Sequence, residues 1–121
     1  MIYIPPQGVL RLLPDPSSVP KPITGILWKH EPNKAAEWDL GFGPDVDYYG
    51  TFKKRTELDK ETGQLVINNM TINDTGEYSV HINGRLLNKT TVKQMSEYEL
   101  CPVKIMVYHN IQCFLSTEMF I

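Results

Sequence analysis

Cysteine, alanine and net charge are all scarce in this sequence of 121 residues. Its two cysteines, Cys101 and Cys113, both lie in the last fifth of the chain, which excludes a disulfide within the first hundred residues. Only Ala35 and Ala36 are alanines, against nine prolines and eight glycines, a composition that disfavours long helices and favours turns. A formal net charge of -2 provides no field that attracts nucleic acid. We therefore expect an all-β protein that binds no nucleic acid.

Long hydrophobic runs are absent as well. The most apolar stretch, residues 101–121, is interrupted by charged side chains such as Lys104 and Glu118, which predicts no membrane insertion by this chain. Residues 1–6 lack the basic and apolar regions of a signal peptide, so we expect them to begin a mature domain or an expressed fragment. Any signal or anchor then lies outside this sequence. Its length suffices for one hydrophobic core and not for two.

Short runs in which apolar and polar residues alternate recur along the first hundred residues. Prolines, glycines and small polar residues separate these runs, and Asn83-Gly84 is typical of a two-residue hairpin turn. Seven or eight short strands at this spacing predict a β-sandwich or a barrel. The expected strands cover residues 8–13, 23–30, 35–40, 46–50, 51–58, 64–70, 76–82 and a long return from 85 to about 100.

A compact motif follows the strand expected at 64–70. The segment from Asp74 to Tyr78 reads D-x-G-x-Y, which resembles the tyrosine corner of immunoglobulin domains. Trp28, fifty residues upstream, matches the tryptophan that these domains bury on their third strand. The alternative is an unrelated β protein that has a buried tryptophan and a turn tyrosine in the same order. The resemblance further implies that Arg55 pairs with Asp74, as in variable-type domains.

The same comparison with immunoglobulin domains reveals a missing bridge. A cysteine normally lies two residues after the corner tyrosine, and here that position is Val80. Its partner on the second strand would fall at Leu10, Leu12 or Leu13. Because losing such a disulfide typically costs about 2–5 kcal/mol, apolar packing around Trp28 has to compensate. We expect an all-β, immunoglobulin-like variable-type β-sandwich that lacks the intersheet disulfide.

Several segments carry a closer resemblance. The run from Ile26 to Trp38, the segment Phe52-Lys53-Lys54-Arg55 and the run from Gly63 to Thr71 resemble the lymphocyte function-associated antigen three and signalling lymphocytic activation molecule (SLAM) group of adhesion receptors. The likeness covers about residues 2–100 and is to their membrane-distal domain. It implies an extracellular domain, at the cell surface or secreted, that binds another cell-surface immunoglobulin-superfamily receptor or a second copy of itself.

The resemblance also implies where the partner binds. In this group the exposed sheet face built by the third, fourth, sixth and seventh strands meets the other receptor in a small, transient contact. Lys29, Lys34 and Glu37 match positions that the family uses for its ligand. The alternative is a solvated charged face without a partner. Further candidates for partner binding are His30, His81, Phe42 and Tyr48, and Trp38 either closes the sheet edge or serves as an aromatic anchor.

Three N-x-S/T sequons begin at Asn69, Asn73 and Asn88, a modest excess over chance. They fall near expected turns or strand ends, as glycans that face water would require. The alternative is that asparagine and threonine gather at turns for their local hydrogen bonds. These sequons support an extracellular glycoprotein.

Residues for catalysis or metal binding do not form a recognisable set. His30, His81 and His109 are far apart in the sequence, and only His30 and His81 could meet across neighbouring strands. The segment Asp45-Val46-Asp47 lacks the remaining ligands of a calcium loop. We therefore expect no enzyme, no metal and no cofactor. A soluble β-sandwich carrier and a homophilic adhesion module are the alternatives to receptor binding.

The two cysteines belong to the end of the chain. We expect the immunoglobulin domain to occupy residues 1–100 and a tail to occupy residues 101–121. Apolar and polar residues alternate around Cys113 as on the second strand of an immunoglobulin domain, so the tail is either the start of a truncated second domain or an unrelated extension.

Overall fold

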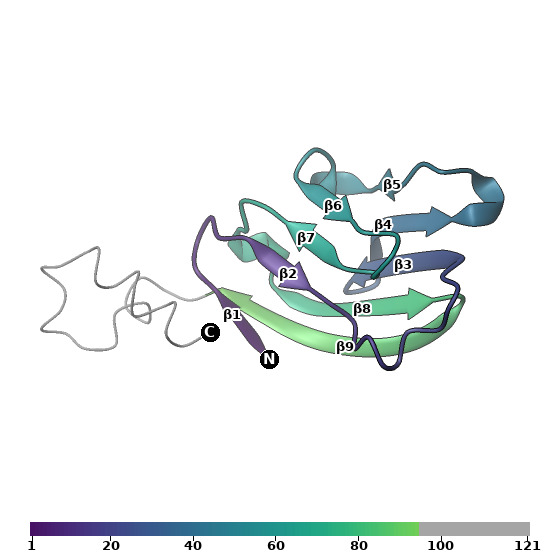
Figure 1. Cartoon of the computed structure of the whole chain (residues 1–121). Coiled ribbons are helices and arrows are strands. Elements are labelled where there is room, and N and C mark those ends of the chain that lie inside the picture. Colours follow the sequence, from purple (N-terminus) through teal and green to yellow (C-terminus); the bar gives the residue numbers. More distant parts are fainter. Residues whose placement is uncertain (95–121) are drawn as a thin grey trace, which may run out of the picture.

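Two β-sheets pack face to face in the computed structural model, which describes residues 1–94 (Figure 1). Six strands form the larger sheet in the order β1-β9-β8-β3-β4-β5, and three form the smaller in the order β2-β7-β6. The larger sheet contains β1 (Ile2–Ile4), β3 (Gly25–His30), β4 (Asn33–Asp39), β5 (Asp47–Tyr48), β8 (Gly76–Ile82) and β9 (Arg85–Gln94). The smaller contains β2 (Leu10–Leu12), β6 (Thr56–Leu58) and β7 (Leu65–Ile67). Three short 3-10 helices, η1 (Leu40–Phe42), η2 (Gly50–Phe52) and η3 (Ile72–Asp74), lie between strands.

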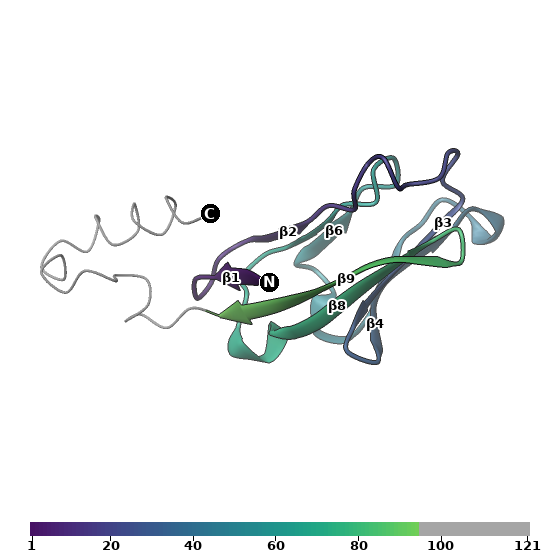
Figure 2. The ribbon, with the colours of Figure 1, turned by 90° about the horizontal axis from the view of Figure 1, so that it is seen from below.

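The two layers are seen from below in Figure 2. All strand pairs are antiparallel except β1 with β9, which run parallel. The strands β4 and β5 extend the larger sheet beyond β3, which is the addition that distinguishes variable-type immunoglobulin sandwiches. In the described part of the chain no helix has the length and apolar character to cross a membrane.

Alternation of side chains builds the core between the sheets. On β8, Tyr78, Val80 and Ile82 are buried, because successive side chains of a strand point to opposite faces. On the facing sheet, Leu10 and Leu12 are buried while Arg11 between them is exposed. The core therefore fills the space between the two sheets, and the opposite face of the larger sheet is left without a covering layer in residues 1–94.

The tyrosine corner is confirmed by its hydrogen bonds. The Tyr78 hydroxyl donates to the backbone carbonyl of Asp74 at 2.5 Å, and burial raises the pKa of that phenol. The Arg55 guanidinium donates two hydrogen bonds, of 2.6 and 3.0 Å, to the Asp74 carboxylate. Burial pushes the pKa of Asp74 upward, but hydrogen bonds from Arg55 and from the Thr71 amide outweigh it and hold the pKa below its usual value. The predicted Arg55–Asp74 pair is thus present and fixes the turn before β8.

Apolar packing takes the place of the intersheet disulfide. Residues 1–94 contain no cysteine, and Val80 is fully buried where the bridge would begin. Of the three leucines proposed to face it, Leu10 and Leu12 lie in the core, whereas Leu13 is 52% exposed. The indole of Trp28 is buried and donates from Nε1 to the carbonyl of Gly63 at 2.8 Å. That bond joins β3 to the turn before β7, so it is a hydrogen bond between the two layers.

Several expected strands differ from the structure in their bounds. The strand expected at 51–58 is largely irregular, because Gly50 and Lys54 have positive φ angles of 56° and 70° that interrupt an extended chain. Only Thr56–Leu58 is strand there. The three-residue strand β1 was not predicted, since it is too short to show an alternation. The hairpin at Asn83-Gly84 is confirmed, with φ angles of 53° and 82° that suit a type I′ turn.

The remaining expectations about domain bounds concern the end of the chain. The strand expected from 85 to about 100 is observed as far as Gln94. The boundary at residue 100, the tail 101–121, and both cysteines lie outside the described residues.

Candidate functional site

The uncovered face of the larger sheet is the candidate site. Its side chains alternate with Trp28 and Val80, which point to the core. Cross-strand register places Leu27 opposite both Glu37 and His81, and Lys29 opposite Lys34. His81 in turn lies opposite Leu86 on β9. We call this surface the outer face and define it by Leu27, Lys29, Lys34, Glu37, His81 and Leu86.

A bulge in the hairpin of β3 and β4 sets the spacing of the charges. The register shifts between Trp28 and Lys29, so that Ala36 pairs with Trp28 and Lys34 pairs with Lys29. The intervening Ala35 is fully buried, which absorbs the extra residue without turning Lys34 into the core. The bulge therefore brings the two lysines to the same face, directly opposite one another.

Glu37 joins the charged side chains into a small network. Its carboxylate accepts a hydrogen bond from Lys34 Nζ at 2.9 Å and one from the Tyr49 hydroxyl at 3.0 Å. The bond from Lys34 holds the pKa of Glu37 below its usual value, and the same bond raises the pKa of Lys34. The Glu37 carboxylate likewise raises the pKa of Tyr49. The Glu37 carboxylate and the Lys34 ammonium are therefore both charged across the physiological pH range.

Lys29 differs from Lys34 in having no such neutralising partner. Among the residues that the structure describes, ion pairs link only Lys34 to Glu37 and Arg55 to Asp74. Lys29 faces the lysine opposite it, and like charges at this position repel each other. A carboxylate from outside the domain would relieve that repulsion. Lys29 is thus a cation of the outer face without an ion pair among residues 1–94, as is Lys89, which register places in the same row across Ser79.

Apolar side chains flank the charges. Leu86 is exposed on β9 and Leu27 is half-buried between Glu37 and His81. Phe42 is 92% exposed in η1, beside the exposed Leu40. The Leu40 amide donates to the carbonyl of Thr24, so η1 is fastened to the end of the sheet where β3 begins. The surface combines exposed aromatic and aliphatic groups with charges, as interfaces commonly do.

His30, a predicted site residue, is instead engaged with the domain's own interior. Its Nε2 lies 2.7 Å from the carbonyl oxygen of Thr75, and its ring stacks on Tyr78 with centroids 4.7 Å apart. His30 lies two positions after Trp28, so the alternation of the strand places both on the same face of β3. Its position supports the tyrosine corner and is remote from the outer face.

Tyr48 also turns inward. Its hydroxyl accepts a hydrogen bond from the Leu58 amide of β6 at 3.0 Å, and its ring packs against the core. The neighbouring Tyr49, which sequence reasoning overlooked, carries the hydroxyl that reaches Glu37. Tyr48 ends β5 and Tyr49 continues the extended backbone, so the two side chains point to opposite faces, and this alternation was the available signal.

The structure decides between the two interpretations of Trp38 that the sequence left open. It is buried in the core opposite Ile26, and the ammonium of Lys60 lies 5.5 Å from the centre of its ring. Trp38 therefore closes the sheet edge and is not an exposed anchor. Its indole nitrogen has no hydrogen-bond partner within residues 1–94.

The histidine pair considered for metal binding is separated by the sheet itself. His81 lies on the outer face opposite Leu27, whereas His30 lies on the inner face. The two rings therefore cannot share an ion. In the described part of the chain no group of three histidine, cysteine, aspartate or glutamate residues is arranged to hold a metal, and this includes Asp45 and Asp47.

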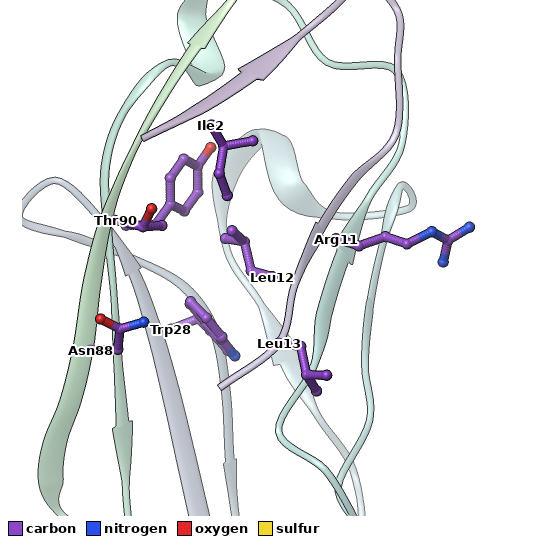
Figure 3. A pocket seen from close by; sticks show the side chains of 8 residues that line it. Ile2, Arg11, Leu12, Leu13, Trp28, Asn88 and Thr90 are labelled. Atoms are coloured by element: carbon purple, nitrogen blue, oxygen red, sulfur yellow. The ribbon is translucent and has the colours of Figure 1, made fainter. Parts of the chain in front are cut away.

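A pocket of about 300 Å³ opens between the two sheets, at the side where β2 and β9 face each other (Figure 3). It is at the lower end of the size range of small-molecule sites. Its walls combine apolar groups with two polar side chains of β9. The lining residues are Ile2, Arg11, Leu12, Leu13, Trp28, Tyr78, Asn88 and Thr90.

The three sequon asparagines are all exposed. Asn69 follows β7 with a positive φ of 54°, Asn73 lies in η3, and Asn88 lies within β9. Their glycosylation stays a prediction.

Comparison with known proteins agrees with this architecture. No family model matches the sequence. Human lymphocyte function-associated antigen 3 is 35% identical over 65 residues, which cover 54% of this chain and 24% of that protein. The chain thus spans about a quarter of the length of this curated relative.

Solved structures extend the likeness to the whole sandwich. The crystal structure of the CD2-binding domain of CD58, which is lymphocyte function-associated antigen 3, has a TM-score of 0.62 and 25% identity, covering 77% of this chain and 50% of that one. The first immunoglobulin-like domain of human CD48 has a TM-score of 0.59 and 20% identity, with coverages of 78% and 80%. CD84, of the SLAM family, has a TM-score of 0.55 and 15% identity, with coverages of 78% and 92%. Residues 1–94 form a variable-type immunoglobulin domain without an intersheet disulfide, and this domain resembles those of lymphocyte function-associated antigen 3, CD48 and CD84.

Proposed function

We propose that this domain is an extracellular recognition module for cell adhesion or immune signalling, which binds another immunoglobulin-superfamily receptor weakly through the outer face. A partner like CD2 is the first to test, because the similar CD58 domain is a CD2-binding domain. No chemistry is proposed for the domain, which acts by binding alone.

The observation that carries the proposal is the unneutralised charge of Lys29 on an uncovered sheet. An acidic partner surface would pair with Lys29 and relieve its repulsion with Lys34. The exposed Leu86 on β9 and Phe42 in η1 would be buried in the same contact. Long-range attraction would speed association, while the modest apolar area would keep the complex transient.

The test measures binding of the purified chain to immobilised CD2 and to a panel of lymphocyte receptors by surface plasmon resonance. Lys29→Glu is expected to weaken binding by at least tenfold, mainly through slower association at low salt. Arg11→Glu is the matched control, since it changes the net charge equally on the exposed side of the smaller sheet. Equal binding by both variants would exclude the outer face.

A second variant separates charge position from total charge. The swap Lys34→Glu with Glu37→Lys keeps the net charge and allows the same neighbours to pair with reversed polarity. Weaker binding with unchanged thermal stability would support recognition of the charge pattern. Self-association of the chain in sedimentation, with no binding to the panel, would favour the homophilic alternative over a heterophilic partner.

A further inference from the structure

The side of the sandwich between β2 and β9 is open. β1 pairs with β9 only at Val92, Lys93 and Gln94, so the stretch of β9 from Arg85 to Thr91 has no neighbour on that side among the described strands. β2 likewise pairs only with β7. An uncovered strand edge is a site of unwanted pairing with other chains, and proteins usually protect it.

The pocket lies along this open side. Leu12 and Trp28 form its apolar depth, and Leu13 and Ile2 lie at its rim. A volume of about 300 Å³ corresponds to roughly ten water molecules in the liquid. A single pyranose ring with an acetamido group is of a comparable size. The walls combine apolar side chains with polar groups in similar measure, which suits an amphipathic ring.

One sequon asparagine is part of the pocket wall. Register places Asn88 opposite Val80, and Val80 is buried, so the Asn88 side chain projects toward the space between the sheets. Its Oδ1 accepts a hydrogen bond from the Lys89 amide at 2.8 Å. The amide nitrogen is thereby turned the other way, toward Trp28 across the pocket mouth (Figure 3). This nitrogen is the atom to which an N-linked sugar is joined.

We propose that Asn88 carries an N-linked glycan whose first N-acetylglucosamine lies in the pocket mouth and closes the open side of the sandwich. The sugar's C–H faces cover Leu12 and Leu13, and its hydroxyl and acetamido groups meet Thr90 and water. The rest of the glycan shields the free edge of β9. Asn69 and Asn73 are not among the residues that line this pocket, so we expect no comparable role in the fold for glycans there. The inference rests on the proposed extracellular location.

The experiment secretes the 121-residue chain from mammalian cells and measures occupancy of each sequon by peptide mass spectrometry. Thermal unfolding is then compared for wild type, Asn88→Gln and the matched control Asn73→Gln. Asn88→Gln is expected to lower the midpoint by at least about 4 °C, the shift that corresponds to about 1 kcal/mol in a domain of this size. Asn73→Gln is expected to leave it unchanged.

Two further samples of the wild-type chain distinguish the effect of the sugar on stability from the effect of the asparagine side chain. Wild type made in bacteria keeps Asn88 without its glycan and is expected to unfold like Asn88→Gln. Secreted wild type trimmed enzymatically to one N-acetylglucosamine is expected to unfold like the untrimmed protein, because the first sugar does the covering. A trimmed protein that unfolds like Asn88→Gln would overturn the proposed position of that sugar.

The outcomes also separate this inference from the proposed function. An empty Asn88 beside an occupied Asn69 overturns the inference and leaves receptor binding standing. A glycan at Asn88 with the expected loss of stability in Asn88→Gln supports it, even if the chain binds none of the receptors tested. Asn88→Gln is expected to bind the receptor as wild type does, since Asn88 faces between the sheets.

Discussion

Replacing Arg55 with methionine is expected to cost about 3–5 kcal/mol, because it leaves the Asp74 carboxylate buried and unpaired. That carboxylate is 3% exposed, and Arg55 supplies two of its charge-assisted bonds, at 2.6 and 3.0 Å. The Thr71 amide alone would remain as its backbone donor. Since small domains are stable by only about 5–15 kcal/mol, the loss would be visible in any equilibrium unfolding measurement.

The assay is urea unfolding at pH 7 of wild type, Arg55→Met, Asp74→Asn and the double variant. The coupling free energy between Arg55 and Asp74 is expected to exceed about 2 kcal/mol, because each single substitution leaves the partner group without its ion pair and the double substitution does not. Lys53→Met is the control, as an exposed cation nearby in sequence, and it should change the free energy of unfolding by less than about 0.5 kcal/mol.

Acid provides an independent check with a definite sign. In wild type the pKa of Asp74 is lowered, so the pair stabilises the fold above the carboxyl's ordinary pKa near 3.8, and this contribution is lost as the pH falls below that value. In Arg55→Met the guanidinium is missing, so burial raises the pKa of the Asp74 carboxyl. Protonation of Asp74 at lower pH then removes the buried unpaired charge, and the variant loses less stability relative to wild type. The difference in the free energy of unfolding between wild type and Arg55→Met should therefore become smaller from pH 7 toward pH 4. A constant difference, or coupling near zero, would refute the reasoning.

Two further pairs of substitutions, each with its own control, test hydrogen bonds of the core. Trp28→Phe and Trp38→Phe remove similar volumes from side chains that are 3% and 7% exposed, yet Trp28 donates to the Gly63 carbonyl and Trp38 has no partner in the described residues. Trp28→Phe should therefore lower the free energy of unfolding by about 1 kcal/mol more, as measured by urea titration, and the opposite order would contradict the assignment. Tyr78→Phe should cost about 1–2 kcal/mol through loss of the corner bond, whereas Tyr3→Phe, an exposed control, should leave the unfolding midpoint in place.

The fold was predictable because its main marks are local in sequence. Asp74, Gly76 and Tyr78 fall within five residues, and Trp28 stands in an alternating run, so neither required knowledge of distant contacts. The buried Val80 followed from its spacing to Tyr78. By contrast, β1 pairs among the described strands only with β9, a contact between opposite ends of the described chain.

The side on which a residue lies was harder to predict for the candidate site. Lys29, Lys34 and Glu37 fall on one face through a bulge whose position no local pattern announces. His30 and Tyr48 look like exposed polar residues in the sequence, but their hydrogen bonds to Thr75 and Leu58 turn them inward. These partners are ten or more residues away, so only the assembled sandwich reveals them.

The absence of cysteine from residues 1–94 makes the stability of the sandwich independent of the redox state of its surroundings. Glutathione or dithiothreitol therefore has no disulfide to cleave between the two sheets of residues 1–94. Once Cys101 and Cys113 are replaced by serine, the chain offers a thiol-free background for spectroscopy. A single cysteine introduced at an exposed position, such as Leu86, would then carry a fluorophore or spin label at a known place beside the charged residues of the outer face.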